Sequence, residues 1–166
     1  MITATAKSDS GIFTVHRVGE SLYYEIPTTE LGKDYLLVTQ LKRTTLGAGY
    51  GGDPVGNRLL RWELTGNRVL LRTVNYSVIS SDPSNQVTRA VQDANTPAIV
   101  RAFNVAAFSP DGAPVIDVTS LFTTEIAEFS ARRNLGGRGF DGSRSFIEKV
   151  VSFPQNINVE VMQTYT

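Results

Sequence analysis

The chain has no cysteine among its 166 residues, and its only histidine is His16. The missing cysteines exclude disulfides, thiolate nucleophiles and cysteine-ligated zinc or iron–sulfur sites. A single histidine excludes metal sites built from several histidines and acid–base catalysis by a histidine pair. We therefore expect no catalytic site, no metal site and no bound cofactor within this chain.

An excess of charge of one sign is also missing, because 16 lysines and arginines balance 16 aspartates and glutamates. A neutral chain has no strong overall field to attract nucleic acid or anionic lipid, so we expect no nucleic-acid partner. No stretch approaches the roughly 18 consecutive apolar residues of a membrane helix, which predicts no membrane insertion. The first residues also lack the basic start and the apolar core of a signal peptide.

What the chain does have is a succession of short segments rich in β-branched and aromatic residues, separated by turn residues. These segments predict strands at residues 12–18, 22–26, 35–41, 59–64, 69–74, 99–108, 115–118 and 157–165. The length fits one β-rich domain over residues 11–166, after a small, polar and flexible lead-in over residues 1–10. We expect an α+β fold that is mainly antiparallel β, either a sandwich or a strongly curved sheet with a few short helices.

Two segments have helical signatures. Asp82-Pro83 predicts the start of a short helix, because the aspartate can cap the first amides and proline suits the first turn. Ser145 and Glu148 have the spacing of a capping box, and apolar residues follow at helical spacing. This pattern predicts a second helix over residues 145–151.

A glycine-rich segment at residues 47–54 contains three glycines at the spacing of a dinucleotide-binding fingerprint. That fingerprint requires a following helix to hold the pyrophosphate, whereas a proline and another predicted strand follow here. We therefore interpret the segment as a structural loop whose glycines adopt positive φ. It places a large aromatic side chain on a flexible arm, which suits contact with a partner surface. The predicted contact residues are Gly49, Tyr50, Gly51 and Gly52.

Three further features have simple structural interpretations. His16 lies in a predicted strand among apolar residues, which is typical of a hydrogen-bonded structural histidine. Asp117 is predicted to cap the turn that begins at Thr119. Residues 131–143 contain four glycines and predict a mobile loop. Extended to residue 144, the segment carries four arginines and is the second candidate for a contact surface.

Taken in order, several segments of the chain resemble the N-terminal region of a family of large bacterial zinc-dependent metallopeptidases related to the metzincins. The likeness covers nearly the whole chain from Gly11, and its specificity lies in the order of the pieces. The segments that carry it are GIFTVHRV at 11–18, LYYEIP at 22–27, LGKDYLLV at 31–38, GYGG at 49–52, RWE at 61–63, RVLLR at 68–72, VIDVTSLF at 115–122, and residues 144–156, which begin with RSF and end with FPQN.

The resemblance implies a noncatalytic N-terminal accessory domain that packs against a downstream catalytic domain absent from this chain. In that family the zinc motif, His-Glu-x-x-His, belongs to the later domain, so zinc is expected there. No zinc ligand is carried over here, since His16 is alone and is not followed by glutamate. Family members are generally exported, which implies a periplasmic or extracellular location for the parent protein.

Two other functions remain open at this point. A free-standing β-rich module could bind a glycan or a peptide, with Trp62 and the tyrosines as stacking surface. An enzyme that uses paired carboxylates would need a deep pocket in which two acids converge.

Overall fold

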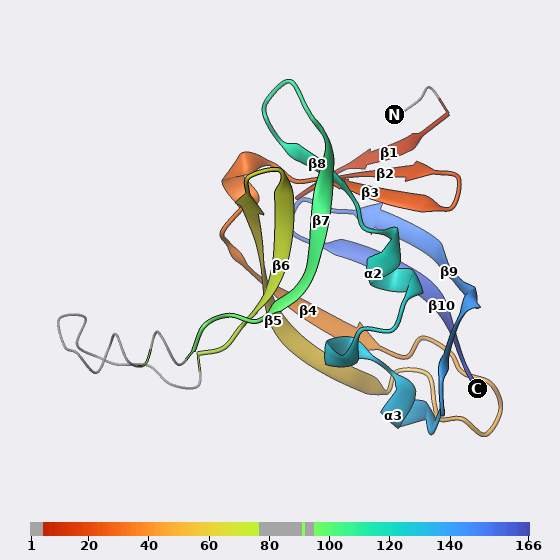
Figure 1. The fold of residues 1–166 in the computed structure, drawn as a ribbon. Helices are drawn as coiled ribbons and strands as arrows, with labels where there is room; N and C mark the ends of the chain where they lie inside the picture. Colours follow the sequence, from red (N-terminus) through yellow and green to blue (C-terminus); the bar gives the residue numbers. More distant parts are fainter. Residues whose placement is uncertain (1–4, 77–90, 92–94) are drawn as a thin grey trace.

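The computed structural model describes residues 5–76, 91 and 95–166 (Figure 1). Its strands are β1 (Lys7–Ser10), β2 (Thr14–Val18), β3 (Ser21–Glu25), β4 (Asp34–Gln40), β5 (Pro54–Thr65), β6 (Arg68–Val74), β7 (Ile99–Phe108), β8 (Pro114–Asp117), β9 (Phe140–Ser152) and β10 (Ile157–Tyr165). The short helical elements are η1 (Thr28–Glu30), α2 (Thr119–Thr123), η2 (Ala127–Phe129) and α3 (Arg132–Leu135). The helix predicted to begin at Asp82 lies outside the described residues.

One sheet contains most of the strands, in the order β1-β2-β3-β8-β7-β6-β5-β4, and every neighbouring pair in it is antiparallel. The first part of β7 pairs with β6 and its last part pairs with β8. The remaining strands, β9 and β10, form a long antiparallel hairpin. The predicted mainly antiparallel β fold with a few short helices is therefore confirmed.

The large sheet is strongly curved, because its two ends meet over the core. Phe13 directly precedes β2 near one end of the strand order, and Tyr35 lies in β4 at the other end. Their ring centroids are nevertheless 5.5 Å apart, in an edge-to-face arrangement. Trp62 of β5 and Tyr24 of β3 complete the same aromatic cluster. Such edge-to-face pairs add about 0.5–1.5 kcal/mol each beyond the apolar area that they bury.

The β9–β10 hairpin packs against this core beside α2 (Figure 1). Ile147 of β9 is buried in the core cluster, and Val159 and Val161 of β10 pack against it. The structure therefore consists of one curved sheet and a covering hairpin.

The helix predicted over residues 145–151 is wrong, since these residues belong to strand β9. Lys149 pairs with Glu160 and Ile147 with Val161, so Glu148 is an extra residue, a β-bulge. The bulge changes the side-chain alternation, and Ile147 and Val150 both contact the core although they are three residues apart. That spacing imitates a helical face.

Two other segments differ from the sequence-based expectation. The lead-in was expected to be flexible through Ser10, but Lys7–Ser10 pairs with β2 as edge strand β1. The predicted loop over residues 131–143 contains the short helix α3 and the beginning of β9.

Candidate functional site

The predicted contact residues lie in the connection between β4 and β5, residues 41–53, which we call the glycine loop. Its base is closed by main-chain hydrogen bonds. The Leu41 amide donates to the Asp53 carbonyl over 2.9 Å, and the Gly52 amide donates to the Leu41 carbonyl over 2.6 Å. At the tip, the Tyr50 amide donates to the Asp53 carboxylate over 3.2 Å. The loop is therefore a hydrogen-bonded structure with a defined tip.

Glycine is required in this loop for two different reasons. Gly47, Gly49 and Gly52 have φ values of 86°, 120° and 95°, in the region that disfavours residues with a Cβ. This confirms the predicted positive φ. Gly51 has ordinary φ but no room, because a Cβ there would lie 2.7 Å from the Lys42 carbonyl oxygen.

The loop presents two large apolar side chains to solvent. Tyr50 is 81% exposed, and Leu46 is fully exposed. Tyr50 was predicted from the sequence as a contact residue, whereas Leu46 was not. The signal for Leu46 was present, since it is an isolated aliphatic residue beside the first glycine of the loop. Together the two side chains form an apolar tip of the kind that partner surfaces bury.

The base of the loop is attached to the β9–β10 hairpin by two ion pairs. The Lys42 ammonium contacts the Glu160 carboxylate at 2.5 Å, and Arg43 pairs with Glu148, the bulge residue of β9. The hydrogen bond from Lys42 lowers the pKa of Glu160. On the other side, the Asn134 side chain of α3 donates to the Pro54 carbonyl over 3.1 Å. These contacts brace the loop against the part of the chain that leads to the C-terminus.

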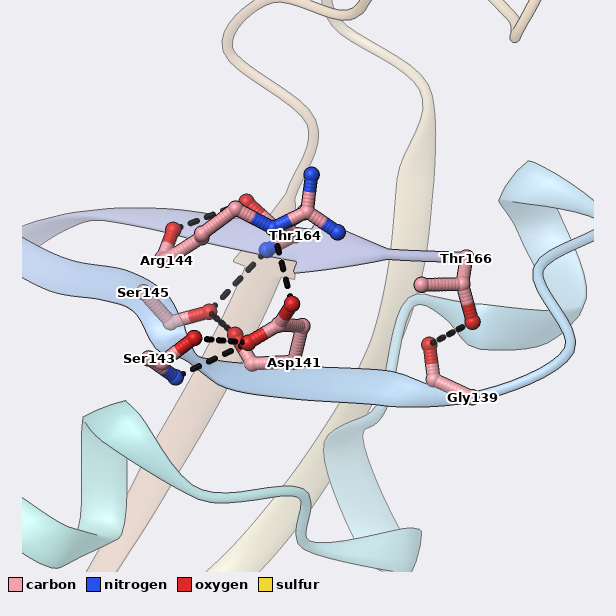
Figure 2. A network of polar contacts seen from close by, with 7 residues as sticks. All are labelled: Gly139, Asp141, Ser143, Arg144, Ser145, Thr164 and Thr166. Atoms are coloured by element: carbon pink, nitrogen blue, oxygen red, sulfur yellow. Dashed lines mark hydrogen bonds and ion pairs between the residues drawn. The ribbon is translucent and has the colours of Figure 1, made fainter.

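The second candidate surface, residues 131–144, is more ordered than predicted. Figure 2 shows Asp141 at the centre of a network at its end. One carboxylate oxygen accepts from the amide and hydroxyl of Ser143, over 3.0 and 2.6 Å, and the other accepts from Arg144 over 2.7 Å. The Ser143 hydrogen bonds, followed by Arg144, lower the pKa of Asp141 to about 2. At least one of the four arginines thus has a structural partner rather than a free charge.

Ser145, predicted to cap a helix, connects the two strands of the hairpin instead (Figure 2). Its hydroxyl donates to the Asp141 carbonyl over 2.7 Å and accepts from the Thr164 amide over 3.0 Å. The Thr164 amide lies where the β9–β10 register shifts, so the buried hydroxyl satisfies a main-chain donor at this irregularity.

His16 is buried and hydrogen-bonded, as predicted for a structural residue. Its Nδ1 lies 2.7 Å from the Ser8 hydroxyl of β1, and its Nε2 lies 3.1 Å from the Glu25 carboxylate of β3. The residue therefore links the three neighbouring strands β1, β2 and β3.

Across residues 5–76, 91 and 95–166, no group of three or more His, Cys, Asp or Glu is placed to hold a metal ion. Asp117 accepts from the Thr119 amide over 2.9 Å, which confirms the predicted cap.

An open hollow of about 580 Å³ lies between β1, β2 and β9. It contains two acids, Asp9 and Glu148, beside the cations Lys7, Arg17 and Lys149. Asp9 accepts from the Ser152 amide and Glu148 pairs with Arg43, so both carboxylates are already engaged. The hollow is therefore a charged surface with engaged acids, unlike the apolar pocket of a catalytic carboxylate pair.

Another open hollow, of about 460 Å³, lies between β7 and α2 and contains a single acid, Asp117.

Trp62, the stacking residue expected for a glycan-binding module, is only 6% exposed and packs inside the aromatic cluster. Within the described part of the chain, no helix is long and apolar enough to span a membrane.

Comparison with known families gives two matches. The model of the family described as Domain of unknown function (DUF5117) matches residues 52–166, and that of Domain of unknown function (DUF5118) matches residues 1–44. Neither the curated proteins nor the solved structures gave a match. In the structure the two matched regions share one sheet: β1, β2, β3 and β4 come from the first region and flank β5 to β8 of the second on both sides.

Proposed function

The chain belongs to the family described as Domain of unknown function (DUF5117), and within it we propose a noncatalytic N-terminal accessory domain of a bacterial zinc-dependent metallopeptidase. In this proposal the domain packs against a catalytic domain further along the same polypeptide. The catalytic zinc belongs to that later domain, and the parent protein is exported to the periplasm or the extracellular space. The ordered resemblance of segments from Gly11 to Asn156 supports this assignment.

The observation that carries the proposal is the braced glycine loop with its exposed apolar tip. Tyr50 and Leu46 project from a loop whose base is held by the Lys42–Glu160 and Arg43–Glu148 ion pairs. A tip held in place loses little conformational entropy when a partner covers it. Its apolar surface then contributes about 25 cal/mol for each Å² removed from water.

The position of the C-terminus supports an intramolecular partner. The Thr166 amide donates to the Gly139 carbonyl over 2.8 Å, which fixes the last residue beside the segment that follows α3. The glycine loop lies at this same end of the molecule (Figure 1), and Asn134 of α3 contacts Pro54 at the end of the loop. A polypeptide that continues from Thr166 would therefore begin at the same end of the molecule as the glycine loop.

The test is Tyr50→Ala in the full-length polypeptide, with peptidase kinetics and interdomain stability as measurements. We expect a lower unfolding temperature of the interdomain contact and a changed kcat/KM, while this domain keeps its own circular dichroism spectrum. Phe108→Ala is the matched control, because Phe108 is also an exposed aromatic residue but lies at the end of β7. We expect this control to leave both measurements unchanged.

Two outcomes would contradict the proposal at different levels. If Tyr50→Ala leaves kinetics and interdomain stability unchanged, the glycine loop is not the contact surface. If the reading frame that encodes this chain contains no His-Glu-x-x-His motif downstream, the metallopeptidase assignment itself is wrong.

A further inference from the structure

The two edges of the large sheet are protected to very different extents. β1 at one edge is short and polar, and all of its residues, Lys7–Ser10, are exposed. Charged residues and short length are the usual protection of an edge strand against pairing with another chain. β4 at the other edge is longer, Asp34–Gln40, and has neither lysine nor proline. Among the described strands, only β5 pairs with it.

The exposed face of β4 is apolar at its centre. Leu36 is 63% exposed and Val38 is 51% exposed, while Tyr35 and Leu37 on the other face pack against the core. The only charged residue of the strand, Asp34, is engaged by Arg61 at 2.7 Å. An apolar, unprotected edge strand of this kind favours pairing with another strand.

The hydrogen-bond pattern shows which main-chain groups of β4 point away from β5. The Trp62 carbonyl of β5 accepts from the Gly32 amide, so the main-chain groups of Trp62 point toward the β4 side. Because main-chain direction alternates along a strand, those of Leu60 and Arg58 point the same way, and these two residues pair with Tyr35 and Leu37. Tyr35 and Leu37 therefore point toward β5, and Leu36 and Val38 point away from it. The free edge therefore offers the amides and carbonyls of the same two residues whose side chains are exposed.

We propose that β4 pairs antiparallel with β4 of a second copy of this chain, about a two-fold axis at Leu37. In this register Leu36 of one copy lies opposite Val38 of the other, and Val38 lies opposite Leu36. The outward main-chain groups of both residues then form hydrogen-bonded pairs, and their exposed side chains cover one another.

Charge and symmetry both fit this occupant. Asp34 of one copy lies opposite Gln40 of the other in the same register, so no like charges face each other. A two-fold contact must be self-complementary, and a strand with apolar residues on either side of its central residue meets that condition. The contact extends the large sheet across both copies. It uses the edge of β4 and not the glycine loop, so it stands whether or not the proposed accessory role is correct.

The test compares Val38→Pro with Val38→Ile. Proline removes the outward amide of residue 38 without removing a hydrogen bond to β5, which is the position where an edge strand tolerates proline. Isoleucine keeps the amide, the β-branching and the apolar contact. In sedimentation equilibrium over a concentration series, we expect wild type and Val38→Ile to approach twice the chain mass of 18.1 kDa. Val38→Pro is expected to remain at the single-chain mass with an unchanged circular dichroism spectrum.

Amide hydrogen exchange of the wild-type chain provides a second test that does not depend on any variant folding. We expect the amides of Leu36 and Val38 to be protected in concentrated protein and to lose protection on dilution. Those of Tyr35 and Leu37, bonded to β5, stay protected throughout. A wild-type chain that remains monomeric at all concentrations overturns the proposal. Concentration-independent protection of Leu36 and Val38 also overturns it, because a strand of the same polypeptide would then cover this edge.

Discussion

At the scale of single residues, short polar side chains hold the irregular parts of this β structure together. Asp141 satisfies the amide and hydroxyl of Ser143 where the β9–β10 register shifts, and Ser145 satisfies the Thr164 amide across the hairpin. His16 joins three strands in a similar way through Ser8 and Glu25. Each of these residue types also occurs in catalytic sites, so identity alone does not separate a structural role from a functional one.

The Asp141 network predicts a specific loss of stability in acid. The pKa of Asp141 is lowered from 3.8 to about 2 in the folded chain, so folding favours the ionised carboxylate. The resulting stability is present above pH 3.8 and is lost as pH falls toward 2. We therefore expect Asp141→Asn to show a smaller drop in urea midpoint than wild type between pH 4 and pH 2.

The control for this measurement is Asp111→Asn, in the exposed turn between β7 and β8. Glu30, Asp34 and Glu160 also have lowered pKa values, and they remain in wild type and in both variants. The acid loss that these three residues cause is therefore common to all profiles, and we expect the control profile to follow that of wild type. Parallel profiles for Asp141→Asn and wild type would show that the Asp141 network does not favour the folded state.

At the scale of elements, the strands with clear alternation or high β propensity were predictable, and the elements shaped by distant contacts were not. The hairpin of β5 and β6 could be located because the turn Gly66-Asn67 separates two apolar segments. β1 could not, because Lys7–Ser10 has no apolar residue and forms a strand only through pairing with β2. In β9, the bulge at Glu148 replaced the two-residue period by a spacing that resembles a helix.

In the glycine loop, too, the local features were predictable from the sequence and the contacts with distant residues were not. Its glycine content and its aromatic residue could be identified from the sequence, and so could the positive φ values. Its bracing could not, because Lys42 and Glu160 are far apart in the chain and meet only when the β9–β10 hairpin covers the sheet. The proximity of the loop to Thr166 likewise depends on the fold.

Gly51→Ala is expected to strain the glycine loop specifically. Its Cβ would lie 2.7 Å from the Lys42 carbonyl oxygen, and a main-chain atom cannot rotate away as a side chain can. We expect a loss of about 1–3 kcal/mol in the free energy of unfolding, with NMR shift changes concentrated in residues 41–53. Gly56→Ala is the control, since the nearest atom to its Cβ, in the Arg58 side chain, is 4.0 Å away. Equal losses for the two variants would show that close packing at Gly51 is not what shapes the loop.

At the scale of the whole molecule, the two regions matched by separate family models share one sheet and one core cluster. The first region supplies β1, β2 and β3 at one side of the sheet and β4 at the other. It also supplies a large share of the buried core: Phe13, Val15, Leu22, Tyr24 and Ile26. Phe13 and Tyr35 both belong to this first region, and their rings are in contact within the core. Phe13 also packs against Trp62 of the second region in the same core.

This interleaving predicts that residues 45–166 alone do not form the native structure. Burial of each of the five missing core side chains contributes roughly 1.5–3 kcal/mol, which together is comparable to the net stability of about 5–15 kcal/mol of a whole domain. We expect the fragment to unfold without a cooperative transition and to lack the near-ultraviolet circular dichroism of Trp62, which packs against Phe13 and Tyr24 in the intact chain. Adding a peptide of residues 1–44 should restore both signals, because it returns both flanks of the sheet at once. A cooperative transition for residues 45–166 alone would mean that the second region has a core of its own, and the two regions would then be separate domains that share a sheet edge.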